Sequence, residues 1–117
     1  MEQYSLTAPN RKENVSMIRL MTSFVAAKMK FDIEAIEDLK VSVGEALNYH
    51  IEKTENFDIV IVEDDDFIEI QFHLGDFDHE EQNPLFDENL SKLILESLMD
   101  HVEFNPSNIV IRKKREQ

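Results

Sequence analysis

Apolar residues recur every three or four positions in two stretches of the N-terminal half, which is the period of an amphipathic helix. The first stretch runs from Lys12 to Lys30. The second follows Asp32, a residue type that caps helix starts, and is expected to extend through residues 37–53. The recurring apolar residues are Val15, Ile18, Met21, Val25 and Met29, and then Ile33, Ile36, Leu39, Val43, Ala46 and Leu47. The pattern therefore predicts two consecutive helices.

Strand patterns precede and follow the helical ones. Residues 57–62 and 67–73 are apolar and β-branched on either side of a charged turn, which predicts an antiparallel hairpin. Residues 4–8 alternate weakly and residues 107–113 read "SNIVIRK", so each predicts a strand. Between the hairpin and the last strand, residues 87–102 show helical spacing behind an Asp that can cap them.

The predicted element order is β-α-α-β-β-α-β over residues 1–117, with no internal repeat and no linker composition. We expect one domain, since this length suffices for a single hydrophobic core. Helices that need a sheet to cover indicate a two-layer α/β sandwich, with a mixed, largely antiparallel sheet and the helices on one face.

Charge narrows the function classes. The chain has 25 acids and 12 bases, for a net charge of −13, which argues against binding to nucleic acid. A solvated acidic surface and a surface that attracts a basic partner both explain the excess. The chain has no cysteine, no apolar run long enough for a membrane span and no signal-peptide pattern at its start, so we expect a cytoplasmic protein.

Two segments carry a resemblance to a known family. "APNRKENVSMIRLMTSFVAAKMKFDIEAIEDLKVSVGEA" is similar in pattern to a helix pair, and "LILESLMDHVEF" to a last helix, of the anti-sigma-factor serine kinases of Gram-positive bacteria. These belong to the GHKL (Bergerat-fold) ATPase superfamily. The resemblance implies that fold, a site for Mg-ATP built from three motifs, and a sigma factor or STAS-type antagonist as protein partner. It also implies a homodimer.

The first motif of that family lies on the second helix, where a Glu precedes a magnesium-binding Asn by one turn. By the resemblance, Glu45 occupies the position of the acid. Four residues later stands Tyr49, whose phenol is a poor magnesium ligand. Asn48 comes one residue early, which is a rotation of about 100° on the helix, so it serves as a metal ligand only after a local shift.

The other two motifs also depart from the family pattern. Where the family has Asp-x-Gly to bind adenine, this chain has His73, Leu74 and Gly75, with Asp76 following on a different side of the turn. Where the family wraps the phosphates with a glycine-rich segment, residues 88–91 contain no glycine. Three lost contacts correspond to roughly 4–8 kcal/mol, so we expect Mg-ATP binding to be lost and no cofactor to be required.

The first helix carries the predicted partner-binding residues. Arg19 stands where the resemblance implies contact with a sigma factor or its antagonist, and we expect it to be exposed beside Met17 and Phe24. The alternative is an ordinary surface arginine.

The acidic segment 76–82 has oxygen donors suited to weak calcium binding. It lacks the residue order of a calcium-binding loop, so the sequence indicates a solvated loop.

Three hypotheses follow. The first is an anti-sigma-factor-like regulator that binds its protein partner without kinase activity. The second is an active serine kinase of the same family, with Glu45 as base and Asn48 recruited for magnesium. The third is a structural dimer without a ligand. The departures in the three motifs favour the first hypothesis.

Overall fold

The computed structural model describes residues 1–49, 51, 54–73, 75, 88–105 and 107–115. Its helices are η1 (Lys12–Asn14), α1 (Val15–Lys28), α2 (Ile33–Asn48) and α3 (Glu88–Leu98). Its strands are β1 (Glu2–Pro9), β2 (Asn56–Glu63), β3 (Phe67–His73), β4 (His101–Asn105) and β5 (Asn108–Lys114).

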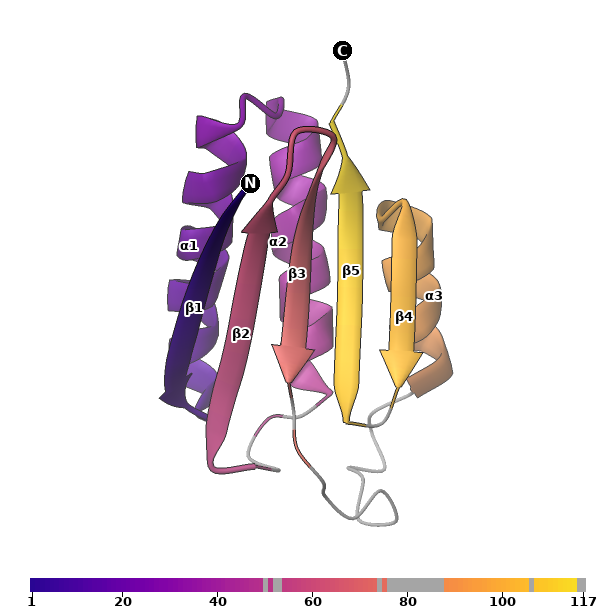
Figure 1. Ribbon diagram of the computed structural model, residues 1–117. Helices are drawn as coiled ribbons and strands as arrows, with labels where there is room; N and C mark the ends of the chain where they lie inside the picture. The colour runs from indigo at the N-terminus through magenta and orange to yellow at the C-terminus, as the bar shows by residue number, and fades with distance from the viewer. Residues whose placement is uncertain (50, 52–53, 74, 76–87, 106, 116–117) are drawn as a thin grey trace.

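The strands form one sheet in the order β1-β2-β3-β5-β4, and all four neighbouring pairs are antiparallel. The three α-helices lie on one face of this sheet (Figure 1). This arrangement confirms the predicted two-layer α/β sandwich with its helices on one face, but the sheet is antiparallel in all the described strand pairs and not mixed. No helix in the described parts of the chain is long and apolar enough to cross a membrane.

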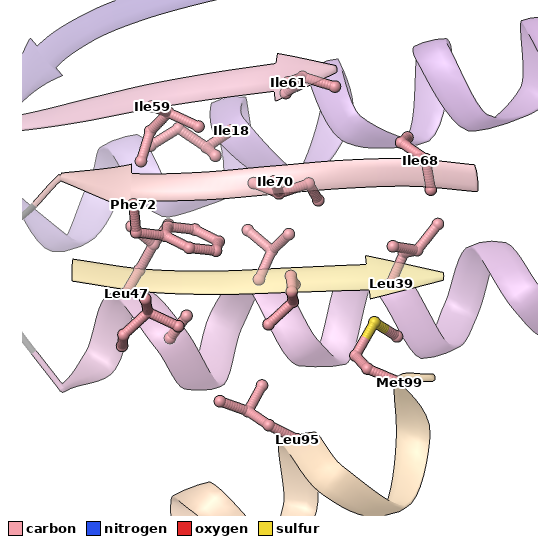
Figure 2. Packing of buried hydrophobic residues seen from close by; sticks show 14 of the residues in the cluster. Ile18, Leu39, Leu47, Ile59, Ile61, Ile68, Ile70, Phe72, Leu95 and Met99 are labelled. Atoms are coloured by element: carbon pink, nitrogen blue, oxygen red, sulfur yellow. The ribbon is translucent and has the colours of Figure 1, made fainter. Parts of the chain in front are cut away.

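The core lies between the two layers. Alternate residues of the strands point toward the helices, so Ile59 and Ile61 of β2 and Ile68, Ile70 and Phe72 of β3 are almost fully buried. They meet Ile18, Leu39, Leu47, Leu95 and Met99 from the helical layer (Figure 2). The strand residues that recur with a period of two and the helix residues that recur with a period of 3.6 therefore pack into one core.

The predicted cap of the second helix is confirmed, because Asp32 Oδ1 accepts a hydrogen bond from the backbone N–H of Ala35 at 2.8 Å. The predicted extension to residue 53 is wrong. Helix α2 ends at Asn48 and Ile51 lies in a turn, since the chain must reverse before it enters β2. Residues 50, 52 and 53 lie outside the described residues.

One strand, β4, is missing from the sequence-based prediction, which placed a helix over residues 87–102. Helix α3 ends at Leu98 instead. The backbone N–H of Asp100 donates to the carbonyl oxygen of Arg112, and its carboxylate accepts from the N–H of Lys114, so both bonds tie this segment to β5. The predicted capping Asp87 lies outside the described residues.

Candidate functional site

The acid of the first motif contacts the helix that begins with the third-motif positions. Glu45 is half-buried near the end of α2, and its Oε2 accepts a hydrogen bond of 2.9 Å from Ser91 Oγ of α3. Ser91 is only 3% exposed and stands at a position where the family resemblance expects glycine. A side chain of the protein therefore lies against the carboxylate that would face a nucleotide.

The position of the metal-binding residue is occupied by a core residue. Tyr49 is 4% exposed, and its ring packs edge-on against Phe104 of β4, with ring centroids 5.1 Å apart and an interplanar angle of 62°. Asn48, by contrast, is exposed. The one-residue offset between them thus has the effect expected from helix rotation, because Asn48 points to solvent.

The second motif keeps one of its two features. Gly75 has a φ of +68°, a conformation that favours glycine, and it is exposed. His73 ends β3 and is also exposed; it stands opposite Asp58 and Asn108 in the neighbouring strands. Asp76, the remaining predicted residue, lies outside the described residues. No group of three His, Asp or Glu side chains that could hold a metal ion occurs among the residues the structure describes.

Arg19 does not stand where the sequence pattern placed it. Its side chain is half-buried against α2, and a Cβ added to Gly44 would come within 3.0 Å of Arg19 Cζ and 3.1 Å of Arg19 Nε. Its Nε is buried and has no hydrogen-bond partner. The absence of a side chain at Gly44 is what lets the guanidinium pack on this helix.

The partner-binding residues predicted on α1 therefore separate into two groups. Met17 is 40% exposed and Phe24 is 69% exposed. Lys28 lies on the same side of α1, and its ammonium group contacts the ring of Tyr4 in β1. Arg19 is turned about 200° away from Met17 and faces α2 instead. Leu20, which is 70% exposed, extends the apolar group of Met17 and Phe24. The predicted partner-binding residues did not include Leu20, although it follows Met17 by three residues and precedes Phe24 by four, on the same side of the helix.

At the β1 edge, Lys28 of α1 contacts three polar side chains of the sheet. Lys28 Nζ lies 2.9 Å from Glu63 Oε1 and 3.5 Å from Glu2 Oε2, and it donates a hydrogen bond to the Tyr4 hydroxyl. The bond to Tyr4, followed by that to Glu63, raises the pKa of Lys28. Lys28 is thus held as a cation at the boundary between α1 and the sheet.

A second polar network lies on the face of the sheet away from the helices. Arg112 Nη2 lies 2.6 Å from Glu69 Oε1, and Gln71 Nε2 donates to Glu69 Oε2 at 2.8 Å. Burial of Glu69 acts to raise its pKa, but the hydrogen bonds from Gln71 and Arg112, together with the charge of Arg112, lower the pKa overall. Arg112 also stacks over the ring of Phe67 at 4.2 Å.

Sequence analysis gave no role in the site to Phe104 or Gly44, and it named Ser91 only as a third-motif position without glycine. Phe104 fell in a segment that the prediction left outside any strand. Gly44 had a usable signal, because a glycine inside a helix costs stability and usually has a packing reason. Ser91 had a weaker signal, namely a small polar residue among the apolar positions of α3.

The fold and the site together define a class. Three helices on one face of an antiparallel sheet, with an acid of α2 turned toward α3, define a two-layer α/β protein of the GHKL-like kind. No family model matches the chain.

Sequence similarity to known proteins shows the family to which the chain belongs. The chain is 30% identical over 118 positions to the serine-protein kinase RsbW of Bacillus licheniformis, covering 83% of this chain and 74% of that protein. The serine-protein kinase RsbW of Listeria innocua is 33% identical over 73 residues, which are 62% of this chain and 43% of the relative. That of Listeria monocytogenes is 44% identical over 46 residues, 39% of this chain and 29% of the relative. The chain belongs to the anti-sigma-factor serine kinase family.

Proposed function

We propose that this protein is a cytoplasmic anti-sigma-factor-like regulator that acts by binding a sigma factor or a STAS-type antagonist, and that it has lost its ATP site. Its relatives carry the name serine-protein kinase RsbW, which supports the regulatory role. The departures from the nucleotide-binding motifs support the loss of kinase activity.

The hydrogen bond between Ser91 and Glu45 carries this proposal. In a working site the carboxylate must face a nucleotide and its metal, with water excluded around them. Here the carboxylate accepts from a buried hydroxyl of the same chain, and Tyr49 fills the metal-ligand position with a ring in the core. A nucleotide would have to break the first contact and would find no metal ligand at the second.

The alternative of an active kinase requires Asn48 to turn toward Glu45. Asn48 is exposed at the end of α2, and the neighbouring Tyr49 is fixed in the core, so a shift of this segment would expose an aromatic ring. Such exposure costs about 2–3 kcal/mol before any metal is bound. No contact of the described residues favours this alternative.

Isothermal titration calorimetry with Mg-ATP and with Mg-ADP tests the loss of the site. We expect no binding in the micromolar range. The serine-protein kinase RsbW of Bacillus licheniformis, titrated in the same buffer, controls for the assay. Micromolar binding by the present chain would refute the proposal of a lost site.

A matched variant sharpens the experiment. Ser91→Gly restores the residue type of the family motif and frees Glu45, while leaving Tyr49 in place. We expect this variant to remain unable to bind Mg-ATP, because the metal ligand and the adenine-binding acid are still missing. Strong binding by Ser91→Gly would mean that Ser91 alone closes the site.

The proposed surface for the protein partner is the exposed apolar part of α1, formed by Met17, Leu20 and Phe24 and called the α1 patch below. Helix α1 contains no acid, although 25 of the 117 residues of the chain are acidic. An apolar, acid-free surface on a strongly acidic molecule is suited to a protein–protein contact.

Titration of a purified sigma factor and of a purified STAS-domain protein from the same organism tests the α1 patch. Phe24→Ser is expected to weaken binding by about tenfold or more, since an aromatic anchor typically contributes at least about 1.4 kcal/mol. Ile33→Ser, at an apolar position of α2 that is even more exposed than Phe24, is the control and should leave binding unchanged. Equal losses in both variants would exclude a specific role for α1.

We further propose that the protein forms a homodimer, as its family resemblance implies. Light scattering coupled to size-exclusion chromatography measures the mass directly. A mass of one chain, 13.7 kDa, at micromolar concentration would contradict the dimer.

A further inference from the structure

The side of α1 that faces away from the sheet has no charged residue. Each residue turns the helix by about 100°, so the buried Ile18 and Val25 mark the side toward the core and Leu20 projects in the opposite direction. This outer face of α1 consists of Ser16, Met17, Leu20, Ser23, Phe24 and Ala27. None of the six is buried, in a chain of which 32% of the residues are charged. An uncharged, exposed face of this length is suited to a contact that excludes water.

The spacing on the outer face of α1 fits a second helix. Met17, Leu20, Phe24 and Ala27 follow one another at intervals of three, four and three residues, which is the spacing along which two helices pack. Large and small side chains alternate on this face, so it offers both ridges and grooves. Ser23 Oγ donates at 2.8 Å to a backbone carbonyl oxygen of its own helix, so this hydroxyl needs no further partner.

The outer face of α1 is left open by the rest of the described chain. Helix α1 lies at the β1 side of the helical layer, with α2 as its helical neighbour (Figure 1). Leu20 is 70% exposed and Phe24 is 69% exposed. A helix that docked here would therefore lie against α1 on the side opposite the sheet.

Charge is unevenly distributed along the chain. Residues 1–31, which include β1, η1 and α1, contain five bases and two acids. Residues 32–117 contain seven bases and 23 acids. The segment that contains α1 is thus net positive in a chain whose net charge is −13, so an element that complements it is acidic.

The cations around the outer face of α1 are mostly unpaired. Arg11 and Lys12 precede α1, Lys30 follows it, and all three are exposed. None of these three, nor Arg19 on the α2 side, forms an ion pair among the described residues. Glu13 is the one acid in residues 3–31.

Acids on the two flanks of α1 are directed to lysines. On the β1 side, Glu2 and Glu63 lie 3.5 and 2.9 Å from Lys28 Nζ. In α2, Glu37 lies 3.3 Å from Lys40 Nζ. The cations at the two ends of the outer face are therefore the charges open to a partner.

We propose that the outer face of α1 binds an amphipathic α-helix of the protein partner, and that acidic residues flank the apolar stripe of that helix. This inference rests on the proposed function of the α1 patch and adds the secondary structure and the charge of the element that binds there. The apolar stripe supplies the buried contact, and the acids meet the cations at the two ends of α1. A basic helix would be attracted by the whole chain but would meet Arg11, Lys12 and Lys30 at this face.

Synthetic peptides test the helix and its charge. The probe is a fluorescein-labelled peptide of about three heptads, with leucine at the a and d positions and glutamate at the e and g positions, where like charges also oppose pairing of the peptide with itself. We expect saturable binding in fluorescence anisotropy. Replacing the glutamates with lysines should weaken binding about tenfold or more, and a central proline, which breaks the helix, should do the same.

Three peptide results would overturn the proposal. The first is no saturable binding of the glutamate probe, the second is equal or tighter binding of the lysine peptide, and the third is equal binding of the proline peptide.

Variants of the full chain locate the peptide. Leu20→Ser is expected to weaken binding of the glutamate probe about tenfold, because the central apolar contact is lost. Leu93→Ser, at a 62% exposed position of α3, is the matched control and should leave binding unchanged. Lys12→Gln should weaken binding about threefold, and Lys114→Gln, at the far end of the chain, should not. Equal effects of Leu20→Ser and Leu93→Ser would contradict binding at α1.

Failure of this proposal and failure of the proposed partner class give different results. If the peptides behave as expected while neither a sigma factor nor a STAS-domain protein binds, α1 binds a helix and the partner class is wrong. If one of those proteins binds through Phe24 while the proline peptide binds as tightly as the probe, the α1 patch is confirmed and the helix is wrong.

Discussion

Ser91 and Glu45 are 46 residues apart in the sequence, and their hydrogen bond joins two helices beside the core. Ser91→Ala is expected to lower the free energy of unfolding by about 1 kcal/mol, because Glu45 loses a buried donor. Urea denaturation measures this change. Ser97→Ala is the control, since Ser97 Oγ donates only to Ile94 O on the exposed side of the same helix and should change stability by less than about 0.5 kcal/mol.

At Lys30 the expected change has the opposite sign. Lys30→Gly should raise the free energy of unfolding by about 0.5–1 kcal/mol, because glycine adopts a φ of +68° without the strain of a Cβ. Thermal denaturation at low ionic strength checks the direction. Lys40→Gly, in the middle of α2, should instead destabilise by about 1 kcal/mol, and a loss in both variants would argue against strain at Lys30.

At the scale of single elements, the start of α2 depends on one side chain. Asp32→Ala removes the acceptor for the N–H of Ala35 and is expected to cost about 1 kcal/mol of stability. Asp32→Asn retains an acceptor oxygen and should keep most of it. Helical circular dichroism followed during denaturation measures both, and an equally large loss in Asp32→Asn would point to charge rather than capping.

Elements were predictable where one period dominates the sequence. The paired helices, the hairpin and the cap at Asp32 follow from local pattern and are confirmed. Strand β4 was not predictable in this way, because Leu98, His101 and Val102 continue the helical spacing of α3, while the alternation of β4 covers only the five residues His101–Asn105. The choice is made by Asp100, whose bonds to Arg112 and Lys114 depend on a strand that comes later in the chain.

The candidate site was predictable only in part, for a related reason. The offset of Asn48 from the expected position follows from helix geometry alone, and its exposure agrees with that. The packing of Arg19 on Gly44 and of Tyr49 on Phe104 depends on how helices and strands approach one another, which sequence spacing along one helix does not specify.

At the scale of the whole molecule, charge couples stability to pH. The pKa of Glu69 is lower in the folded protein than its ordinary value of 4.5, so its contribution to stability is present above about pH 4.5 and is lost as pH falls through the lowered pKa. We expect Glu69→Gln to be destabilised relative to the wild type by about 1 kcal/mol at pH 7 and by less near pH 3. Denaturation of both proteins across this range tests the prediction; a difference that is constant with pH would contradict it.

The contact between Ser91 and Glu45 also has a consequence for how the protein responds to its surroundings. A fold that is closed by a bound ligand gains stability only while that ligand is abundant, and it loosens when the supply falls. Here α2 and α3 are joined by a hydrogen bond between two side chains of the same chain, so both partners are always present. On the proposed loss of the ATP site, this contact between α2 and α3 is expected to be independent of the nucleotide supply of the cell.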